Sequence, residues 1–264
     1  MKNYLTYPCK VMNITQGYTG NTSHSPHNTG TPKDYPWDEA CEGSGRSHMY
    51  CPCDEMLVKR IYTKGTNTIW LESTLEVLLA DGTSDFVTLM VMHPNDSDIS
   101  QLEVGQKFTR GEEICKEGTD GNATGNHFHF AIGKGKSKGN GWVQNSKGKW
   151  VLNCVGGSQK PETMFYIDRE FTTLVKKTQG LMFKDLPKED DFLPEKGYLE
   201  KGDNGKSIEM LCDFFANNVK GSYFGDYLEA CVKVFQKQNG LETDGKVTEM
   251  LLKKLKEKGF KKGE

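Results

Sequence analysis

Apolar residues in the first two thirds of the chain recur with the period of a β-strand. Residues 127–132 alternate polar and apolar side chains, which predicts a strand with one buried face. Residues 86–92 are apolar almost throughout, which predicts a strand buried on both faces. The Asp81-Gly82 pair separates this run from the apolar run 75–80 and predicts a hairpin. Further strands are predicted at 58–62 and 68–71, and a turn leading into a short strand within 106–115.

After residue 198 the apolar residues recur with the period of a helix instead. Three groups of apolar residues have this spacing, and they predict three short amphipathic helices in a compact bundle. The groups are Ile208, Leu211, Cys212 and Phe215, then Leu228, Cys231, Val232 and Phe235, then Leu251, Leu252 and Leu255. The preceding segment is charged and contains Pro187 and Pro194, which is typical of a linker.

These patterns predict an α+β protein with three parts. Residues 1–178 form an antiparallel β-sheet domain whose long loops border a groove, residues 179–197 are a linker, and residues 198–264 form a three-helix bundle. The 29 glycines cluster between short apolar runs, which favours a loop-rich β domain over a helical one for the first part.

Composition and charge exclude several classes of function. The 264 residues are 35% apolar and 27% charged, as in folded globular proteins. Because 34 basic residues face 36 acidic ones without a basic stripe, we expect no nucleic-acid partner. The N-terminus has no apolar core of signal-peptide length, and no segment is long enough to cross a bilayer. We therefore expect a protein that does not insert into membranes and is made in the cytoplasm without a signal peptide. We also expect a monomer.

Eight cysteines are present, and we expect free thiols rather than a disulfide framework. The chain is long for a disulfide-stapled miniprotein, and the spacing fits no such framework. Cys41, Cys51 and Cys53 lie close together, and a second, structural zinc site there is an alternative. Their spacing is not the CxxC of such sites, so buried thiols are the preferred interpretation.

Candidate chemistry centres on the histidines, of which there are only six. His127 and His129 are two residues apart in a predicted strand, so both imidazoles point to the same side of the sheet. They follow a glycine-dense loop, 118–126, which allows a substrate backbone to approach closely. His93 ends the buried strand 86–92. Imidazoles gathered in this way suit a metal ion or a proton-transfer pair, although two histidines on an exposed sheet would give the same motif.

These motifs together resemble the lysostaphin-type (LytM-like) zinc endopeptidases. The resemblance covers residues 16–132 and depends on His93-Pro94, on Val104-Gly-Gln-Lys-Phe-Thr-Arg-Gly-Glu-Glu-Ile, and on the glycine loop followed by His127-Phe-His-Phe. It implies that His129 is a zinc ligand and that His93 and His127 are the catalytic pair. The family also uses a His-x-x-x-Asp motif near the N-terminus, from which this sequence departs.

The departure leaves the remaining two ligands to be assigned. Asp34 stands four residues before Asp38, where the family has histidine. The resemblance of Tyr-Pro-Trp-Asp38 to the family's Gly-Ile-Asp strand implies Asp38 as the carboxylate ligand. We expect His27 as the third ligand, with His24 or Asp34 as alternatives.

The C-terminal segment resembles the three-helix peptidoglycan-binding domain of wall hydrolases. Its most specific parts are Val234-Phe-Gln-Lys-Gln-Asn-Gly-Leu and Thr243-Asp-Gly. The two resemblances imply a zinc endopeptidase that cuts peptidoglycan peptides, similar to a bacteriophage endolysin of a Gram-positive host that reaches the wall after release through a membrane pore. A non-catalytic LytM-like regulator and an N-acetylmuramoyl-L-alanine amidase are the alternatives.

Overall fold

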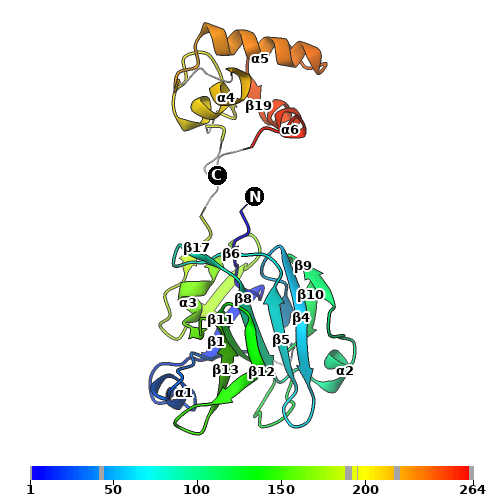
Figure 1. The fold of residues 1–264 in the computed structure, drawn as a ribbon, viewed down its shortest axis with the longest axis vertical. Coiled ribbons are helices and arrows are strands. Elements are labelled where there is room, and N and C mark those ends of the chain that lie inside the picture. The colour runs from blue at the N-terminus through cyan, green and yellow to red at the C-terminus, as the bar shows by residue number, and fades with distance from the viewer. Residues whose placement is uncertain (1, 42–44, 188–191, 195, 217–220, 262–264) are drawn as a thin grey trace. The chain divides into compact units, whose positions relative to one another are not determined.

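The structure, a computed structural model, describes residues 2–41, 45–187, 192–194, 196–216 and 221–261. It divides into two compact units, Met1–Leu186 and Pro187–Glu264 (Figure 1). The first is rich in antiparallel strands and the second is helical, which confirms the α+β fold class. Among the described residues, no helix has both the length and the apolar character needed to cross a membrane.

A nine-stranded sheet organises the first unit. Its strands follow the order β16-β1-β2-β11-β8-β5-β4-β9, with β14 also paired to β11. All pairings are antiparallel except that of β1 with β16. The strands are β1 Val11–Gln16, β2 Trp37–Glu39, β4 Glu55–Tyr62, β5 Thr68–Ser73, β8 Val87–Met92, β9 Lys107–Thr109, β11 Phe128–Lys134, β14 Ser158–Gln159 and β16 Leu174–Lys177.

Smaller elements surround this sheet. Four strand pairs are separate from it: β3 His48–Tyr50 with β10 Glu113–Lys116, β6 Val77–Leu78 with β7 Ser84–Asp85, β12 Ser137–Gln144 with β13 Trp150–Cys154, and β15 Tyr166–Ile167 with β17 Lys184–Asp185. The helices of this unit are short: α1 Ser25–Thr29, α2 Asp96–Ile99 and α3 Pro161–Met164.

Strand β11 shows how the alternating pattern positions the candidate site. Phe128, Phe130 and Ile132 are fully buried in the main apolar core on one side of the sheet. Burial of such side chains stabilises the fold by about 1.5–3 kcal/mol each. His129 and Ala131 point to the other face, as the period of two requires. The apolar half of the pattern therefore fixes the direction in which the histidine points.

The predicted hairpin forms at Asp81-Gly82, but its paired strands are short. Gly82 has a φ of +89° and its N–H donates to Leu79 O at 2.9 Å, so a residue without a Cβ suits the turn. After β7 the chain enters β8, which lies between β5 and β11 in the main sheet. The first five residues of β8 are buried, as predicted from its continuous apolar sequence.

The second unit contains the three predicted helices. They are α4 Lys206–Ala216, α5 Asp226–Gln238 and α6 Glu249–Glu257, and the strands β18 Tyr198–Leu199 and β19 Val247–Thr248 pair beside them. Thr248 caps α6, its hydroxyl accepting a hydrogen bond from Leu251 N at 3.4 Å. The apolar residues that predicted the helices form a core separate from that of the first unit.

The segment predicted as a linker, 179–197, contributes to both units instead. Leu181 is buried in the core of the first unit, and β17 pairs with β15 there. Phe192 is buried in the core of the second unit. The prediction gave weight to the charges and prolines and missed single apolar side chains that anchor the segment at each end.

The prediction of buried free thiols is confirmed for six cysteines: Cys9, Cys51, Cys53, Cys115, Cys154 and Cys212. Cys51 Sγ donates to Cys53 O at 3.3 Å, so this pair lies in the core and is satisfied by the backbone. Cys51 and Cys53 therefore behave as small core residues.

Candidate metal centre

Two of the predicted ligands face each other across adjacent strands. Asp38 in β2 and His129 in β11 are directly opposite in the antiparallel register, so their side chains share one face of the sheet. Asp38 Oδ1 lies 3.0 Å from His129 Nδ1. The sequence-based pairing of these residues, 91 positions apart, therefore corresponds to a direct contact.

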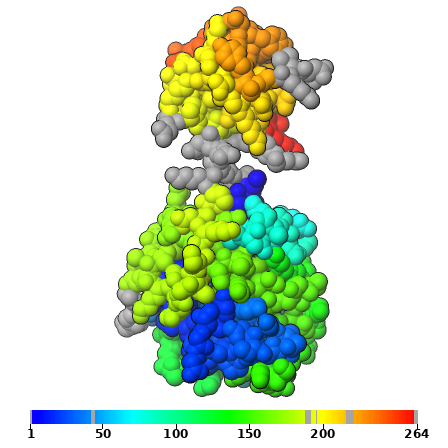
Figure 2. Space-filling view, turned by 90° about the vertical axis from the view of Figure 1, so that its left-hand side faces the viewer, coloured from blue at the N-terminus to red at the C-terminus, as the bar shows by residue number. Residues whose placement is uncertain are grey.

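A third side chain comes from the start of α1, which lies at the surface of the first unit in the blue part of Figure 2. His24 is the N-cap residue of this helix, and its Nε2 lies 3.3 Å from Asp38 Oδ1. One ligand atom each of His24, Asp38 and His129 falls within 4.8 Å of the other two. The structure thus gathers two imidazoles and one carboxylate from three separate segments.

His27, expected as the third ligand, is not part of this group. It lies one helical turn after His24, with its ring centroid 6.2 Å from that of His129, against 4.8 Å for His24. Its Nδ1 is buried without a hydrogen-bond partner, 4.0 Å from Asp34 Oδ2. The helix brings the first histidine of Ser-His-Ser-Pro-His to Asp38 and leaves the second beside it. The structure therefore brings His24, one of the alternatives, and not His27, to Asp38 and His129.

Asp34, the other alternative, points elsewhere. Its carboxylate is fully buried and accepts hydrogen bonds from Leu152 N at 3.1 Å and Tyr35 N at 3.0 Å. These bonds tie the segment before β2 to β13. Asp34 therefore positions the chain around the site and is not in the cluster.

The two separations from Asp38 to the histidine nitrogens suit a small tetrahedral ion. An ion bound to nitrogen and oxygen at about 2.0–2.1 Å separates its ligand atoms by about 3.3 Å. Asp38 Oδ1 is 3.0 Å and 3.3 Å from the two histidine nitrogens. Two imidazoles and one carboxylate are a donor set that zinc accepts, with a fourth position left open.

Electrostatics favour the protonation states that metal binding requires. Burial raises the pKa of Asp38, but hydrogen bonds from His129 and His24 outweigh it and hold that pKa well below its usual range. Burial lowers the pKa of His24 despite its contact with Asp38. Burial, with His129 and His24 nearby, lowers the pKa of His27 to about 3. An ionised Asp38 beside a neutral His24 is the state in which these two residues bind a cation.

The predicted catalytic pair lies next to this cluster. The rings of His93 and His127 have centroids 4.5 Å apart, and the His93 ring is 6.1 Å from that of His129. His93 Nδ1 donates to Asp120 O at 2.7 Å and His127 Nδ1 donates to Gly125 O at 2.9 Å. Because a carbonyl only accepts, each Nδ1 carries a proton, and Nε2 is the acceptor whenever the ring is neutral. Burial lowers the pKa of His93 to about 4, which keeps this ring neutral at pH 7.

The backbone at His93 is strained, which marks it as more than a strand end. Its φ of +79° is unusual for a residue with a Cβ. The glycine loop holds this conformation: Asp120 N donates to His93 O at 3.2 Å, and a Cβ on Gly118 would lie 2.5 Å from that oxygen. Glycine at 118 is therefore required for the loop to pack against His93.

Two residues that position the site were not anticipated from the sequence. The Asp120 carbonyl orients His93, and the Asn145 amide donates to Pro26 O and His27 O at 3.4 and 3.5 Å, joining the turn between β12 and β13 to α1. Asp120 acts through its own main-chain carbonyl, and the Asn145 side chain binds main-chain carbonyls of α1. Because every residue carries a main-chain carbonyl, no motif in the sequence points to these contacts.

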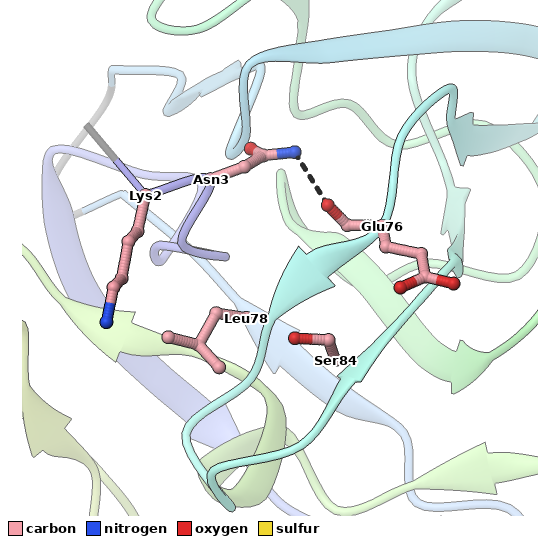
Figure 3. A pocket seen from close by; sticks show the side chains of 5 residues that line it. All are labelled: Lys2, Asn3, Glu76, Leu78 and Ser84. Carbon is pink, nitrogen blue, oxygen red and sulfur yellow. Dashed lines mark hydrogen bonds between the residues drawn. The ribbon is translucent and has the colours of Figure 1, made fainter. Parts of the chain in front are cut away.

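A separate pocket lies away from this cluster, between the N-terminal segment and the β6–β7 hairpin (Figure 3). It is lined by Lys2, Asn3, Glu76, Leu78 and Ser84. Asn3 Nδ2 donates to Glu76 O across it at 3.0 Å. Its described lining contains no histidine or cysteine, so it does not share the chemistry of the cluster.

Comparison with known proteins adds information about both units. Residues 212–255 match the family model of a putative peptidoglycan binding domain, which agrees with the resemblance of the C-terminal unit. The chain is 33% identical over 144 residues to Morphogenesis protein 1 of Bacillus phage B103. This match covers 52% of the chain and 34% of the phage protein, so the chain spans about a third of that relative's length.

Similar solved structures include two peptidases. A zinc-containing peptidase from Vibrio cholerae has a TM-score of 0.34 and 18% identity over 50% of this chain and 36% of that one. Lysostaphin from Staphylococcus simulans has a TM-score of 0.35 and 16% identity over 72% of this chain and 61% of that one.

Proposed function

We propose that this chain is a zinc endopeptidase that hydrolyses peptide bonds in bacterial peptidoglycan, as an endolysin does. The observation that carries the proposal is the convergence of His24, Asp38 and His129 on one point, beside the His93–His127 pair. The C-terminal match to a peptidoglycan-binding family supports the bacterial wall as the substrate. Similarity to a protein of a Bacillus phage supports an origin of this chain in a phage that infects a walled host.

His24, Asp38 and His129 would hold the zinc ion. When bound, zinc supplies a Lewis acid that polarises the scissile carbonyl and lowers the pKa of a water molecule toward about 7. Asp38 contributes a negative charge that offsets part of the ion's charge, while the two imidazoles keep the set neutral enough to leave the ion electrophilic. The ligands come from β2, β11 and the start of α1, so the fold sets their spacing before any ion binds.

His93 and His127 would move the proton and steady the developing charge. Each ring is fixed by a bond from Nδ1 to a carbonyl, so both rings leave Nε2 for the reaction. A neutral Nε2 accepts the proton of the attacking water, and the imidazolium so formed donates to the departing amine or to the carbonyl oxygen. Both rings offer the same atom, so either can take the first proton.

The experiment that tests the proposal is digestion of purified peptidoglycan, followed by mass spectrometry of the fragments. We expect new amino and carboxyl ends inside the stem or bridge peptides, loss of these products with a chelator, and their return when zinc is added. Free stem peptides with intact peptide bonds would instead indicate an amidase. Intact wall from a protein that carries no zinc would indicate a non-catalytic regulator.

A further inference from the structure

An aromatic cluster occupies the face of the sheet that carries His129. In β11, His129 lies opposite Met92 of β8, and Ala131, the next residue on that face, lies opposite Met90. Trp70 of β5 lies opposite Met90 from the other side of β8. Trp70, Met90 and Ala131 form one buried group with the β12–β13 hairpin. The aromatic cluster is therefore continuous with the candidate metal centre along one sheet surface.

The hairpin extends this group outward to solvent. Trp142 on β12 packs edge-on against Trp70 and Tyr62, with ring centroids 4.9 Å apart in both pairs. Trp150 on β13 is the diagonal neighbour of Trp142, with a centroid distance of 5.9 Å. Trp150 is 58% exposed, whereas Trp70 is fully buried. The cluster thus runs from the core to an accessible indole.

The hairpin is anchored in the middle of β12 and at its turn. Trp70 Nε1 donates to Gly141 O at 3.0 Å, and a Cβ on Gly141 would lie 2.6 Å from the Trp70 ring. At the turn, the Asn145 amide bonds to Pro26 O and His27 O in α1, the segment that supplies His24. Trp150 follows that anchored turn directly. An exposed indole fixed in this way presents a preformed surface, so binding on it costs little ordering entropy.

The charged side chains on the hairpin and its flanking segments are of one sign, and the carboxylates that bond to the hairpin, Asp34 and Glu72, are buried. Between Gly121 and Pro161 the chain has six lysines and no acidic residue. Lys134 pairs with Asp81, but Lys138 and Lys149 have no carboxylate within ion-pair distance among the described residues. Lys149 is close enough to contribute to the lowered pKa of His27. The surface therefore suits a ligand that has apolar faces and carries carboxylates.

We propose that Trp150, backed by Trp142, is a subsite for an N-acetylhexosamine ring of the glycan strand while its peptide lies at the metal centre. This inference rests on the proposed function. The C–H groups on one face of a pyranose are weakly positive and pack on the negative face of an indole. The neighbouring lysines complement the carboxylates of stem peptides on the same strand. The chain would then bind sugar and peptide together through its first unit.

Direct binding tests the subsite without reference to hydrolysis. The full chain is titrated by calorimetry with a peptide-free N-acetylglucosamine tetramer. We expect Trp150→Ala and Trp150→Gln to weaken binding about tenfold and Trp150→Phe to retain most of it, because the phenyl ring keeps an aromatic face. Val155→Ala, which also changes an exposed apolar side chain in this region, is the matched control and should bind as the unaltered chain does. Equal affinity of the unaltered chain and Trp150→Ala would overturn the proposal.

Kinetics separate failure of the subsite from failure of the proposed function. The ratio of kcat/KM for a cross-linked muropeptide with its sugars to kcat/KM for the same peptide without sugars is measured for each protein. We expect this ratio to fall several-fold in Trp150→Ala and to hold in Val155→Ala. Hydrolysis with an unchanged ratio would overturn the subsite alone. No hydrolysis of either substrate by the unaltered chain would contradict the proposed function, and the titration would still decide the subsite.

Discussion

At the scale of the residue, the chemistry of the site depends on which nitrogen each imidazole leaves available. His93 and His127 each give Nδ1 to a backbone carbonyl, whereas His129 and His24 direct a nitrogen at Asp38. The four imidazoles are thereby divided into two that suit an ion together with Asp38 and two that suit proton transfer. The division makes distinct predictions for substitutions in each group.

Removing a ligand and removing a member of the pair should have different effects. His129→Ala should lower zinc affinity by at least about a hundredfold, since even outer-sphere changes cost 10–100-fold, and should abolish wall lysis. His93→Ala should keep the zinc and abolish lysis, because its ring bonds only to the loop. Elemental analysis of the purified variants, beside a turbidity assay on cell walls, measures both properties. Full lysis by either variant would contradict the assigned roles.

His24 and His27 allow a matched comparison within one short helix. His24→Ala should lose zinc as His129→Ala does, because His24 Nε2 is the atom next to Asp38. His27→Ala should cost about tenfold in affinity or less, as expected for a neighbour outside the ligand group. Competition with a chromogenic chelator measures both affinities. Loss of zinc only in His27→Ala would restore the assignment made from the sequence.

The sequence was informative about the site where a motif lies within one strand. His127-x-His129 and the residue that ends the apolar strand, His93, were identified from local patterns, and Asp38 was found from four residues that resemble a family strand. The structure brings His24, and not the preferred His27, to Asp38, because this contact depends on the path of the 14-residue segment before Asp38. That path is set by contacts of α1 with Asn145, more than 100 residues away, which no local pattern records.

At the scale of the element, the β12–β13 hairpin depends on one glycine. A Cβ on Gly141 would meet the Trp70 ring, and its φ of +84° already disfavours a side chain. Gly139 has a φ of +54°, but the nearest atom to its Cβ position is 3.9 Å away. A side chain at Gly139 would therefore introduce backbone strain alone, whereas one at Gly141 would introduce strain and a clash with Trp70. Both positions lie in β12.

Substitution of these glycines should show the difference. Gly139→Ala should cost about 1–2 kcal/mol of unfolding free energy, the usual penalty of a left-handed backbone. Gly141→Ala should cost about 1–3 kcal/mol more, because the hairpin must move away from Trp70. Urea denaturation followed by tryptophan fluorescence measures both values. Equal costs would mean that the hairpin does not depend on this contact.

In the second unit, a buried amide organises the turn between α5 and β19. Gln236 Nε2 donates to Asp244 Oδ1 at 2.7 Å and to Lys246 O at 3.0 Å, and its Oε1 accepts from Gly245 N at 2.9 Å. The amide is buried, and all these partners lie in the Thr243-Asp-Gly turn and the residue after it. The two sequence motifs that identified this unit are therefore in contact: Gln236 belongs to the first, and the turn that it binds is the second.

Loss of this amide should destabilise the unit. Gln236→Ala leaves Gly245 N and Lys246 O without their partner and should cost about 2–4 kcal/mol. Gln238→Ala, an exposed change in the same helix, is the control and should cost under about 0.5 kcal/mol. Thermal unfolding followed by circular dichroism near 222 nm measures the helical unit. Similar midpoints for the two variants would show that the network contributes little.

Elements with a clear period were predicted well, and those held by backbone contacts were not. The strands β4, β5, β8 and β11 and the three helices of the second unit all follow their apolar periods. The β12–β13 hairpin was missed because glycine, lysine and asparagine dominate its first strand and hide any alternation. It forms because the indoles of Trp70 and Trp142 pack together, a contact between positions 72 residues apart.

At the scale of the whole molecule, two separate apolar cores imply two units that fold independently. Leu181 and Phe183 close the core of the first unit, and Phe192 packs against Phe260 in the second. A division that keeps both cores whole must therefore fall between Leu186 and Phe192. Cutting at 178, the boundary expected from the sequence, would remove Leu181 and the β15–β17 pairing from the first unit.

Truncation after Leu186 should therefore separate attachment from catalysis. The shortened chain keeps the complete sheet and every residue of the candidate centre, so we expect it to fold, to bind zinc and to hydrolyse a soluble cross-linked peptide at an unchanged rate. Its retention on sedimented cell walls should fall by about tenfold or more, because the unit that matches a peptidoglycan-binding family is gone.

The matched control is truncation after Thr178, which should lose stability because Leu181 no longer fills the core. Co-sedimentation and peptide turnover, measured on the same preparations, check both effects. If turnover on the soluble peptide fell as far as wall retention, the second unit would be needed for the reaction itself. The assignment of catalysis to the first unit and of wall attachment to the second would then be wrong.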